Sequence, residues 1–292
     1  MRHGRVGRRG GGRHARRTRT LVGSAIGLLS AAMAITCAIV LINPGTGAVQ
    51  VASRMANTAG TVPLRAPGAP SSLTGGEPFD GTPAVGALFT LSGGQLGRHF
   101  CTGSVVDSPH GDLVITAAHC VTGKPPGQIA FVPGYHSGVA PFGVWLTSAV
   151  LSDSAWQASS DPDHDVAFLV VHQAGSSMRV QSLTGGEQLG IGWPPRAWVQ
   201  VIGYPDATEQ PITCQNESKP LGQDQMEFDC GGYTDGTSGG PFLGRVNPST
   251  GVGTVIGVIG GYEQGGDIAS VSYSPWFGSA VQALYQSAVA QS

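Results

Sequence analysis

Three short strings in the chain contain residue types that can carry out nucleophilic catalysis. The strings are TAAHC at 116–120, DVAFL at 165–169 and DGTSGGP at 235–241. A serine hydroxyl is a weak nucleophile at neutral pH, so it needs a neighbouring base to take its proton and an acid to orient that base. We therefore predict Ser238 as the nucleophile, His119 as the base and Asp165 as the orienting acid.

The glycines around Ser238 allow a tight turn, in which the backbone N–H groups of Gly236 and Ser238 can point at a developing oxyanion. Residues 236–240 also match the G-x-S-x-G turn of α/β-hydrolases, which place the histidine after the serine. The last histidine here is His172, so that order is excluded. A subtilisin-like order, with the acid before the histidine, does not suit the β-rich pattern of this chain.

The composition indicates a mostly β domain. The 292 residues include 46 Gly and 20 Pro, which penalise helix interiors, and only 12% of residues are charged. Short apolar runs separated by turn residues predict about eleven strands, which suggests one or two antiparallel barrels or sandwiches. The predicted strands are 84–91, 100–106, 113–116, 129–132, 144–151, 166–171, 197–202, 226–228, 241–246, 252–259 and 268–273.

One helix is predicted at the C-terminus, because apolar residues recur there at intervals of three and four. They are Phe277, Val281, Leu284, Tyr285 and Ala288.

The N-terminal region predicts a membrane anchor. Residues 1–20 contain eight Arg and no acid, and residues 21–42 are uncharged and long enough to cross a bilayer. We predict a cytoplasmic tail at 1–20, a single-pass signal anchor at 21–42 and a catalytic domain outside the cell. Secretion after signal cleavage is the alternative, with a small-residue site at 51–53.

Residues 43–83 are rich in Pro, Gly, Ser, Thr and Ala, which is typical of a linker or propeptide. The folded domain is predicted over 84–292. After residue 42 the chain has 8 basic and 18 acidic residues, so a nucleic-acid partner is not expected. We expect a monomer.

Four cysteines lie in the predicted domain, where disulfides would persist outside the cell. They are Cys101, Cys120, Cys214 and Cys230. Three connectivities are open, and we favour the local pairs 101–120 and 214–230. No C-x-x-C is present, and the acids at 161–165 lack the glycine and distal Glu of an EF-hand. We expect no metal and no cofactor.

Taken together, TAAHC, DVAFL and GTSGGP resemble the trypsin/chymotrypsin-like serine peptidases over residues 84–290. The resemblance implies two six-stranded antiparallel barrels with a C-terminal helix, and an active site in the cleft between them. It also implies that His119, Asp165 and Ser238 form a triad, and that Gly236 and Ser238 form the oxyanion hole. The spacing of Cys101 and Cys120 is similar to the family's disulfide beside the histidine.

The chain departs from the animal trypsins, because Thr237 stands where they have Asp. It is more similar to the bacterial secreted branch, which includes the glutamyl endopeptidases. The position six residues before the nucleophile, which forms the pocket base in this family, is uncharged here. Neither arginine nor glutamate specificity is therefore supported, and we predict an uncharged substrate pocket shaped by Gly232, Tyr233, Gly260 and Tyr262.

The sequence thus predicts a serine endopeptidase that hydrolyses polypeptides through an acyl-enzyme. The alternative from a different class is a catalytically silent domain of the same fold, used for binding at the cell envelope.

Overall fold

The computed structural model describes residues 74–292. The predicted basic tail, the signal anchor at 21–42 and most of the predicted linker lie outside these residues. Across residues 74–292, no helix combines the length and apolar character needed to cross a membrane.

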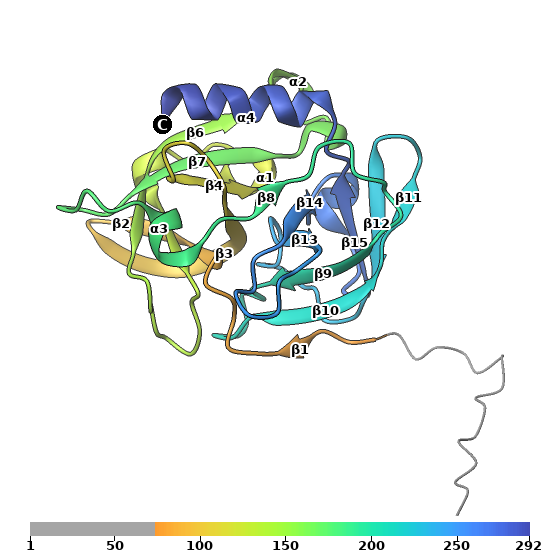
Figure 1. Ribbon diagram of the computed structural model, residues 1–292, viewed down its shortest axis with the longest axis horizontal. Helices are drawn as coiled ribbons and strands as arrows, with labels where there is room; N and C mark the ends of the chain where they lie inside the picture. Colours follow the sequence, from red (N-terminus) through yellow and green to blue (C-terminus); the bar gives the residue numbers. More distant parts are fainter. Residues whose placement is uncertain (1–73) are drawn as a thin grey trace, which may run out of the picture. The chain divides into compact units, whose positions relative to one another are not determined.

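The first half of the domain is a closed barrel of six antiparallel strands (Figure 1). Its interior contains the fully buried side chains of Leu88, Phe131, Trp145 and Leu169. Closure leaves no free strand edge, so neighbouring strands hold one another in register. In barrel order the strands are β2 Val85–Ser92, β3 Gln95–Val106, β4 Leu113–Thr116, β7 Ala167–His172, β6 Trp145–Ser152 and β5 Ile129–Pro133.

The second half is built from two sheets, where the resemblance implied a second closed barrel of six strands. The first sheet has the order β1 Glu77–Pro78, β10 Ile212–Glu217, β9 Trp198–Gly203, β13 Pro241–Gly244, β14 Thr254–Val258 and β8 Gln188–Leu189, with β14 and β8 parallel. The second has the order β11 Lys219–Leu221, β12 Gln225–Asp229 and β15 Val271–Pro275.

Side chains and a single backbone bond from Gly260 N to the Tyr273 carbonyl at 2.9 Å, rather than a continuous ladder, join these two sheets. The hydroxyl of Ser274 in β15 accepts the N–H of Val258 in β14 at 2.9 Å. That N–H is therefore not available to pair with a β15 carbonyl, which interrupts the ladder where closure would occur. On the other side, the disulfide from Cys214 in β10 to Cys230 connects the sheets just after β12.

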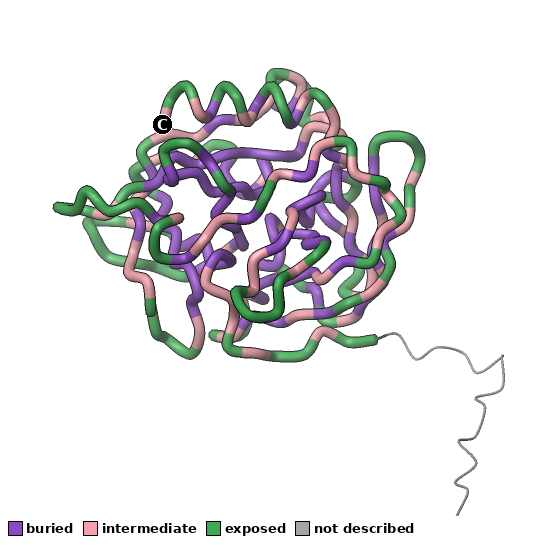
Figure 2. Tube along the Cα trace, in the orientation of Figure 1, coloured by how far each residue is buried: buried purple, intermediate pink, exposed green. Residues whose placement is uncertain are grey.

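The C-terminal helix α4, Ser279–Gln291, packs across β6 and β7 of the first barrel. Its buried side chains are Val281, Leu284 and Ala288, and its outward face is exposed (Figure 2). The Tyr285 ring meets the Phe168 ring edge-on at 5.8 Å, and its hydroxyl donates to the Asp107 carbonyl. Phe277 precedes the helix and is fully buried. The chain therefore returns to the first barrel after completing the second half.

Short helices lie in the connections between strands. They are α1 Ala118–Val121, α2 Ser154–Ser159 and α3 Val180–Thr184, with the 3₁₀ turns η1 Pro126–Gln128, η2 Pro162–His164 and η3 Tyr262–Gly265.

Each of the eleven predicted strands overlaps a strand of the structure, and the pattern missed β1, β8, β10 and β11. Residues 74–83, assigned above to the linker, instead pack on the second half. Gly76 N donates to Gly231 O at 2.7 Å, Gly231 N donates to Thr74 O at 2.9 Å, and β1 pairs with β10. Backbone groups make these contacts, so the polar composition of the segment gave no indication of them.

Candidate active site

The first barrel places His119 beside Asp165. His119 lies in α1, directly after β4, and Asp165 lies between η2 and β7. Because β4 and β7 pair antiparallel, the end of one strand meets the start of the other. His119 Nδ1 lies 2.7 Å from Asp165 Oδ2, and the His119 backbone N–H donates to Oδ1 at 2.8 Å. One carboxylate thus holds both the ring and the backbone of the histidine.

Asp165 is fully buried, and a third N–H group stabilises its carboxylate. Gly261, which belongs to the second half of the domain, donates its N–H to Asp165 Oδ2 at 2.9 Å. A Cβ at Gly260 would lie 2.9 Å from the same oxygen, so this close approach requires glycine. Three N–H donors compensate for the loss of water around the buried charge.

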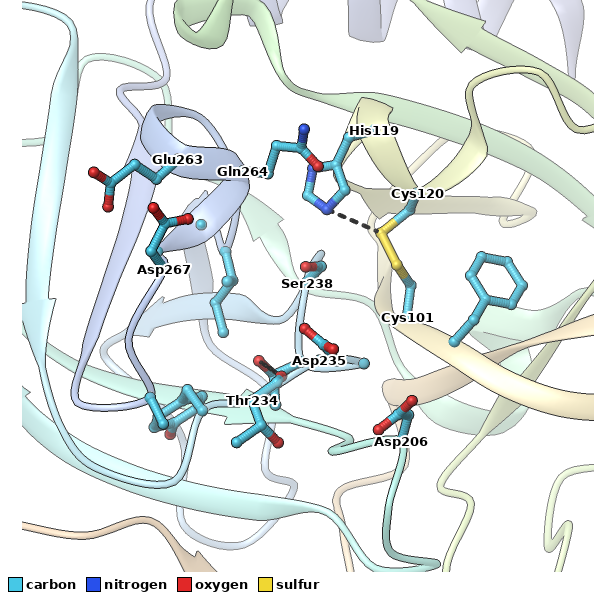
Figure 3. A pocket seen from close by; sticks show the side chains of 18 of the residues that line it. Cys101, His119, Cys120, Asp206, Thr234, Asp235, Ser238, Glu263, Gln264 and Asp267 are labelled. Atoms are coloured by element: carbon cyan, nitrogen blue, oxygen red, sulfur yellow. Dashed lines mark hydrogen bonds between the residues drawn. A yellow bond between two sulfur atoms is a disulfide. The ribbon is translucent and has the colours of Figure 1, made fainter.

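The contact with Asp165 also selects one tautomer of the neutral imidazole. A carboxylate can only accept, so in the neutral ring Nδ1 of His119 carries the proton and Nε2 has a free lone pair. Nε2 contacts Cys120 Sγ at 3.8 Å, and the ring is 14% exposed (Figure 3). The neutral form of His119 therefore presents Nε2 as a proton acceptor to the cavity that it lines.

Cys120 is bonded to Cys101, so both predicted disulfides, 101–120 and 214–230, are present in the structure. Cys101, His119 and Cys120 form the one group of potential metal ligands found among residues 74–292. Its two sulfur atoms are bonded to each other, which removes the thiolates that a metal would bind.

Ser238 lies in a loop, residues 234–238, whose five carbonyl oxygens all accept hydrogen bonds. The Thr234 carbonyl accepts from both the N–H and the hydroxyl of Thr237, and the Asp235 carbonyl accepts from Asp206 N. The Gly236 carbonyl accepts from the Thr102 hydroxyl, the Thr237 carbonyl from Gly240 N and the Ser238 carbonyl from Thr102 N. By contrast, within residues 74–292, the N–H groups of Gly236 and Ser238 donate to no acceptor. The loop thus has all five carbonyls occupied, whereas three of its N–H groups, those of Asp235, Gly236 and Ser238, donate to no acceptor among the described residues.

Peptide geometry explains where these two N–H groups point. In a trans peptide the C=O and N–H bonds point in opposite directions. Asp206 N holds the Asp235 carbonyl at 2.8 Å, which turns the N–H of Gly236 away from Asp206. Gly236 has φ +92°, and a Cβ there would lie 2.5 Å from Asp206 N, so glycine is required.

His119 and Ser238 both line one cavity of about 1150 Å³ (Figure 3). In the described part of the chain, no hydrogen bond connects Ser238 Oγ to His119 Nε2; such bonds often tighten only when substrate binds. The cavity lining also includes four carboxylates, from Asp206, Asp235, Glu263 and Asp267, and one ammonium group, from Lys124. The ammonium donates to the Cys120 carbonyl at 2.9 Å.

Of the four residues predicted to shape the substrate pocket, Tyr233 lines this cavity. Its hydroxyl donates to the Val201 carbonyl at 2.8 Å, and burial raises the pKa of its phenol. Gly232, Gly260 and Tyr262 are not among the lining residues. Tyr262 is exposed and meets the Tyr273 ring edge-on at 5.1 Å.

Sequence reasoning missed two segments of the cavity wall. The stretch 263–269 forms one side, and Asp206 lies with Ala207 on another. The string EQGGDIA at 263–269 directly follows Tyr262, which was assigned to the pocket, and its glycine pair and two acids were a usable signal. Nothing local distinguishes Asp206, because its place depends on contacts with Asp235 across the fold.

Comparisons with known proteins agree with this architecture. The family model described as a trypsin-like peptidase domain matches residues 101–258. No curated protein matches the chain by sequence.

Three solved structures are similar to the chain. The protease Anisep from Arthrobacter nicotinovorans has 25% identity and a TM-score of 0.62, covering 74% of this chain and 99% of its own. A thermostable serine protease, AL20, from an extremophilic microorganism has 26% identity and a TM-score of 0.60, covering 72% and 99%. A Glu endopeptidase has 14% identity and a TM-score of 0.56, covering 74% and 97%, and shows likeness of fold alone.

Proposed function

This chain belongs to the trypsin-like peptidase family and is a serine endopeptidase, and we propose that Ser238, His119 and Asp165 perform its chemistry. The observation that carries the proposal is the pairing of His119 Nδ1 with buried Asp165. This pairing leaves Nε2 free in a cavity that Ser238 also lines. A polypeptide is the substrate class that the fold implies.

In the proposed reaction, Ser238 Oγ attacks the carbonyl carbon of the scissile peptide, and His119 Nε2 takes the hydroxyl proton. Asp165 stabilises the imidazolium that forms. The free N–H groups of Gly236 and Ser238 donate to the oxyanion of the tetrahedral intermediate. His119 then gives its proton to the leaving amine, which produces an acyl-enzyme. Water, deprotonated by His119, hydrolyses this ester and restores Ser238.

Replacing the nucleophile tests this assignment. We expect Ser238→Ala to lower kcat by about 10⁶-fold and to abolish labelling by a fluorophosphonate probe, with the fold retained. Ser287→Ala is the matched control, because Ser287 is an exposed serine of α4. The control should be labelled like the unmodified protein. Labelling of Ser238→Ala at an undiminished rate would refute the assignment.

The same probe separates the peptidase from its rival, a silent binding domain of the same fold. Such a domain would bind peptides without turnover and would leave the unmodified protein unlabelled.

We also propose that the domain acts as a monomer outside the cytoplasm, anchored through residues 21–42. The support is the uncharged segment behind a basic tail, together with two disulfides, which persist in oxidising compartments. N-terminal sequencing of the mature protein tests the anchor, which a mature N-terminus beyond residue 42 would contradict.

A further inference from the structure

The hydroxyl of Thr102, a fully buried residue of β3, reaches from the first barrel into the second half of the domain. It accepts the N–H of Tyr204 at 2.9 Å and donates to the Gly236 carbonyl at 3.0 Å. These two groups are far apart in sequence, so the hydroxyl joins the end of β9 to the loop that contains Ser238. A hydroxyl can donate one bond and accept another, and this one does both.

The backbone of Thr102 contacts the same loop. Its N–H donates to the Ser238 carbonyl at 2.7 Å, and its own carbonyl accepts the Thr116 hydroxyl at 2.7 Å. Thr116 ends β4, three residues before His119. Thr102 is thus linked by short hydrogen bonds both to the strand that leads to the base and to the loop that carries the nucleophile.

The Thr102 side chain has no equivalent around this loop. Of the side chains outside residues 234–238 that the structure describes, it alone donates to a carbonyl of the loop. The Gly236 carbonyl belongs to the peptide that lies between the free N–H of Gly236 and that of Ser238. The two N–H groups belong to the peptide units on either side of it, which share Cα atoms with it. A displacement of the 236–237 peptide would therefore shift both neighbouring units and their N–H groups.

From these contacts we propose that Thr102 is a positioning residue for catalysis. Its hydroxyl holds the 236–237 peptide so that the N–H groups of Gly236 and Ser238 converge on the oxyanion. This rests on the proposed function of the loop. Without the hydroxyl, the Gly236 carbonyl loses its donor, and the loop turns to find another. Misplaced N–H donors weaken the binding of the transition state, which carries the oxyanion, more than the binding of the substrate.

Kinetics of Thr102→Val, which keeps the shape of the side chain and removes the hydroxyl, test the proposal. We expect kcat for a peptide substrate to fall by about 10–100-fold and KM to change by less than about 3-fold. Thr102→Ser restores the hydroxyl and should recover kcat to within about 3-fold. Thr184→Val is the matched control, since Thr184 is a buried threonine of α3 whose hydroxyl also donates to a backbone carbonyl.

Inhibitor binding separates positioning from a general loss of stability. A peptide boronic acid forms a tetrahedral adduct whose oxygen occupies the oxyanion position, whereas a product peptide does not. Thr102→Val should lower the affinity for the boronic acid by the same factor as it lowers kcat/KM. The affinity for the product peptide should be unchanged. If Thr102→Val does not fold, Thr102→Ala is tested in its place, because a water molecule can fill the space left by the hydroxyl. We still expect kcat of Thr102→Ala to fall by at least about 3-fold.

Unchanged kcat in the folded Thr102 variant, or an equal loss in Thr184→Val, would overturn the positioning role. That failure differs from failure of the proposed function, in which Ser238→Ala itself would retain activity.

Discussion

The two halves of the domain position their functional groups in different ways. The first barrel is closed, and it presents His119 and Asp165 through a direct contact between two side chains. The second half has two sheets joined by side chains, one backbone bond and a disulfide. It positions Ser238 and the N–H groups of Gly236 and Ser238 through hydrogen bonds to the backbone carbonyls of their loop. The side-chain pair in the first barrel takes one outside donor, Gly261 N, whereas three of the loop's carbonyls, those of Asp235, Gly236 and Ser238, take donors from distant segments.

Those outside donors come from both halves. Thr102 belongs to the first barrel, while Asp206 and Gly240 belong to the second. In return, Gly261 of the second half donates to Asp165 in the first. Each half therefore completes the hydrogen bonding of the other half's functional residue, and this exchange sets the cleft geometry. The predictions below separate side-chain positioning in the first half from backbone positioning in the second.

Among variants that alter positioning rather than the nucleophile itself, the largest effect is expected in the first half, where one side-chain contact orients the base. Asp165→Asn replaces an acceptor with an amide that can donate to Nδ1, which favours the wrong tautomer of His119. We expect kcat to fall about 10⁴-fold at neutral pH with little change in KM. Steady-state kinetics with a peptide substrate measure this, and circular dichroism checks the fold. A loss of less than about 10-fold would contradict the orienting role.

A smaller effect is expected in the second half from Gly236→Ala, because the change acts through the backbone. The added Cβ would lie 2.5 Å from Asp206 N and from the Tyr204 carbonyl, at a φ of +92°. The loop must shift, and kcat should fall about 10²–10³-fold, as when one oxyanion donor is lost.

Gly222→Ala is a suitable control for Gly236→Ala. Gly222 also has positive φ, but nothing lies within 4 Å of its added Cβ. Its backbone strain would lower stability without lowering kcat. Equal kcat for the two variants would contradict backbone positioning of the oxyanion loop.

The smallest effect concerns Glu187, which connects the halves and touches no catalytic residue named above. Its backbone bonds to Val105 and Asp107, and its carboxylate accepts the Gly253 N–H at 2.5 Å. Burial raises the pKa of this carboxyl to about 7, and the Gly253 N–H opposes the shift only in part. The folded state therefore retains a proton that the unfolded chain releases near its ordinary value.

The sign of the pH dependence follows from this proton. Between about pH 4.5 and pH 7 the folded state binds more protons, so the unfolding free energy decreases as pH rises. The contribution is complete below pH 4.5 and has been lost above pH 7, with a total on the order of 3 kcal/mol. Glu187→Gln should flatten this part of the profile. Urea titrations from pH 5 to pH 8 measure it, and an unchanged slope would exclude Glu187 as its source.

Local pattern and chain order determined much of this protein. The apolar runs located eleven strands, and the order of His119, Asp165 and Ser238 excluded the competing hydrolase arrangement. These features are readable because strand formation and nucleophile chemistry depend on neighbouring residue types. Polar strand β10 and two-residue β8 escaped detection, since their pairing depends on backbone groups that every residue has.

Only the tertiary structure decided how the second half stays open, which residues line the cleft, and which cysteines are joined. Val258 pairs with the hydroxyl of Ser274, and Asp206 enters the cleft through its contact with Asp235. The hydroxyl of Thr102 reaches Gly236 across 134 residues of sequence. Contacts of this kind arise when packing brings distant segments together, so no local pattern encodes them.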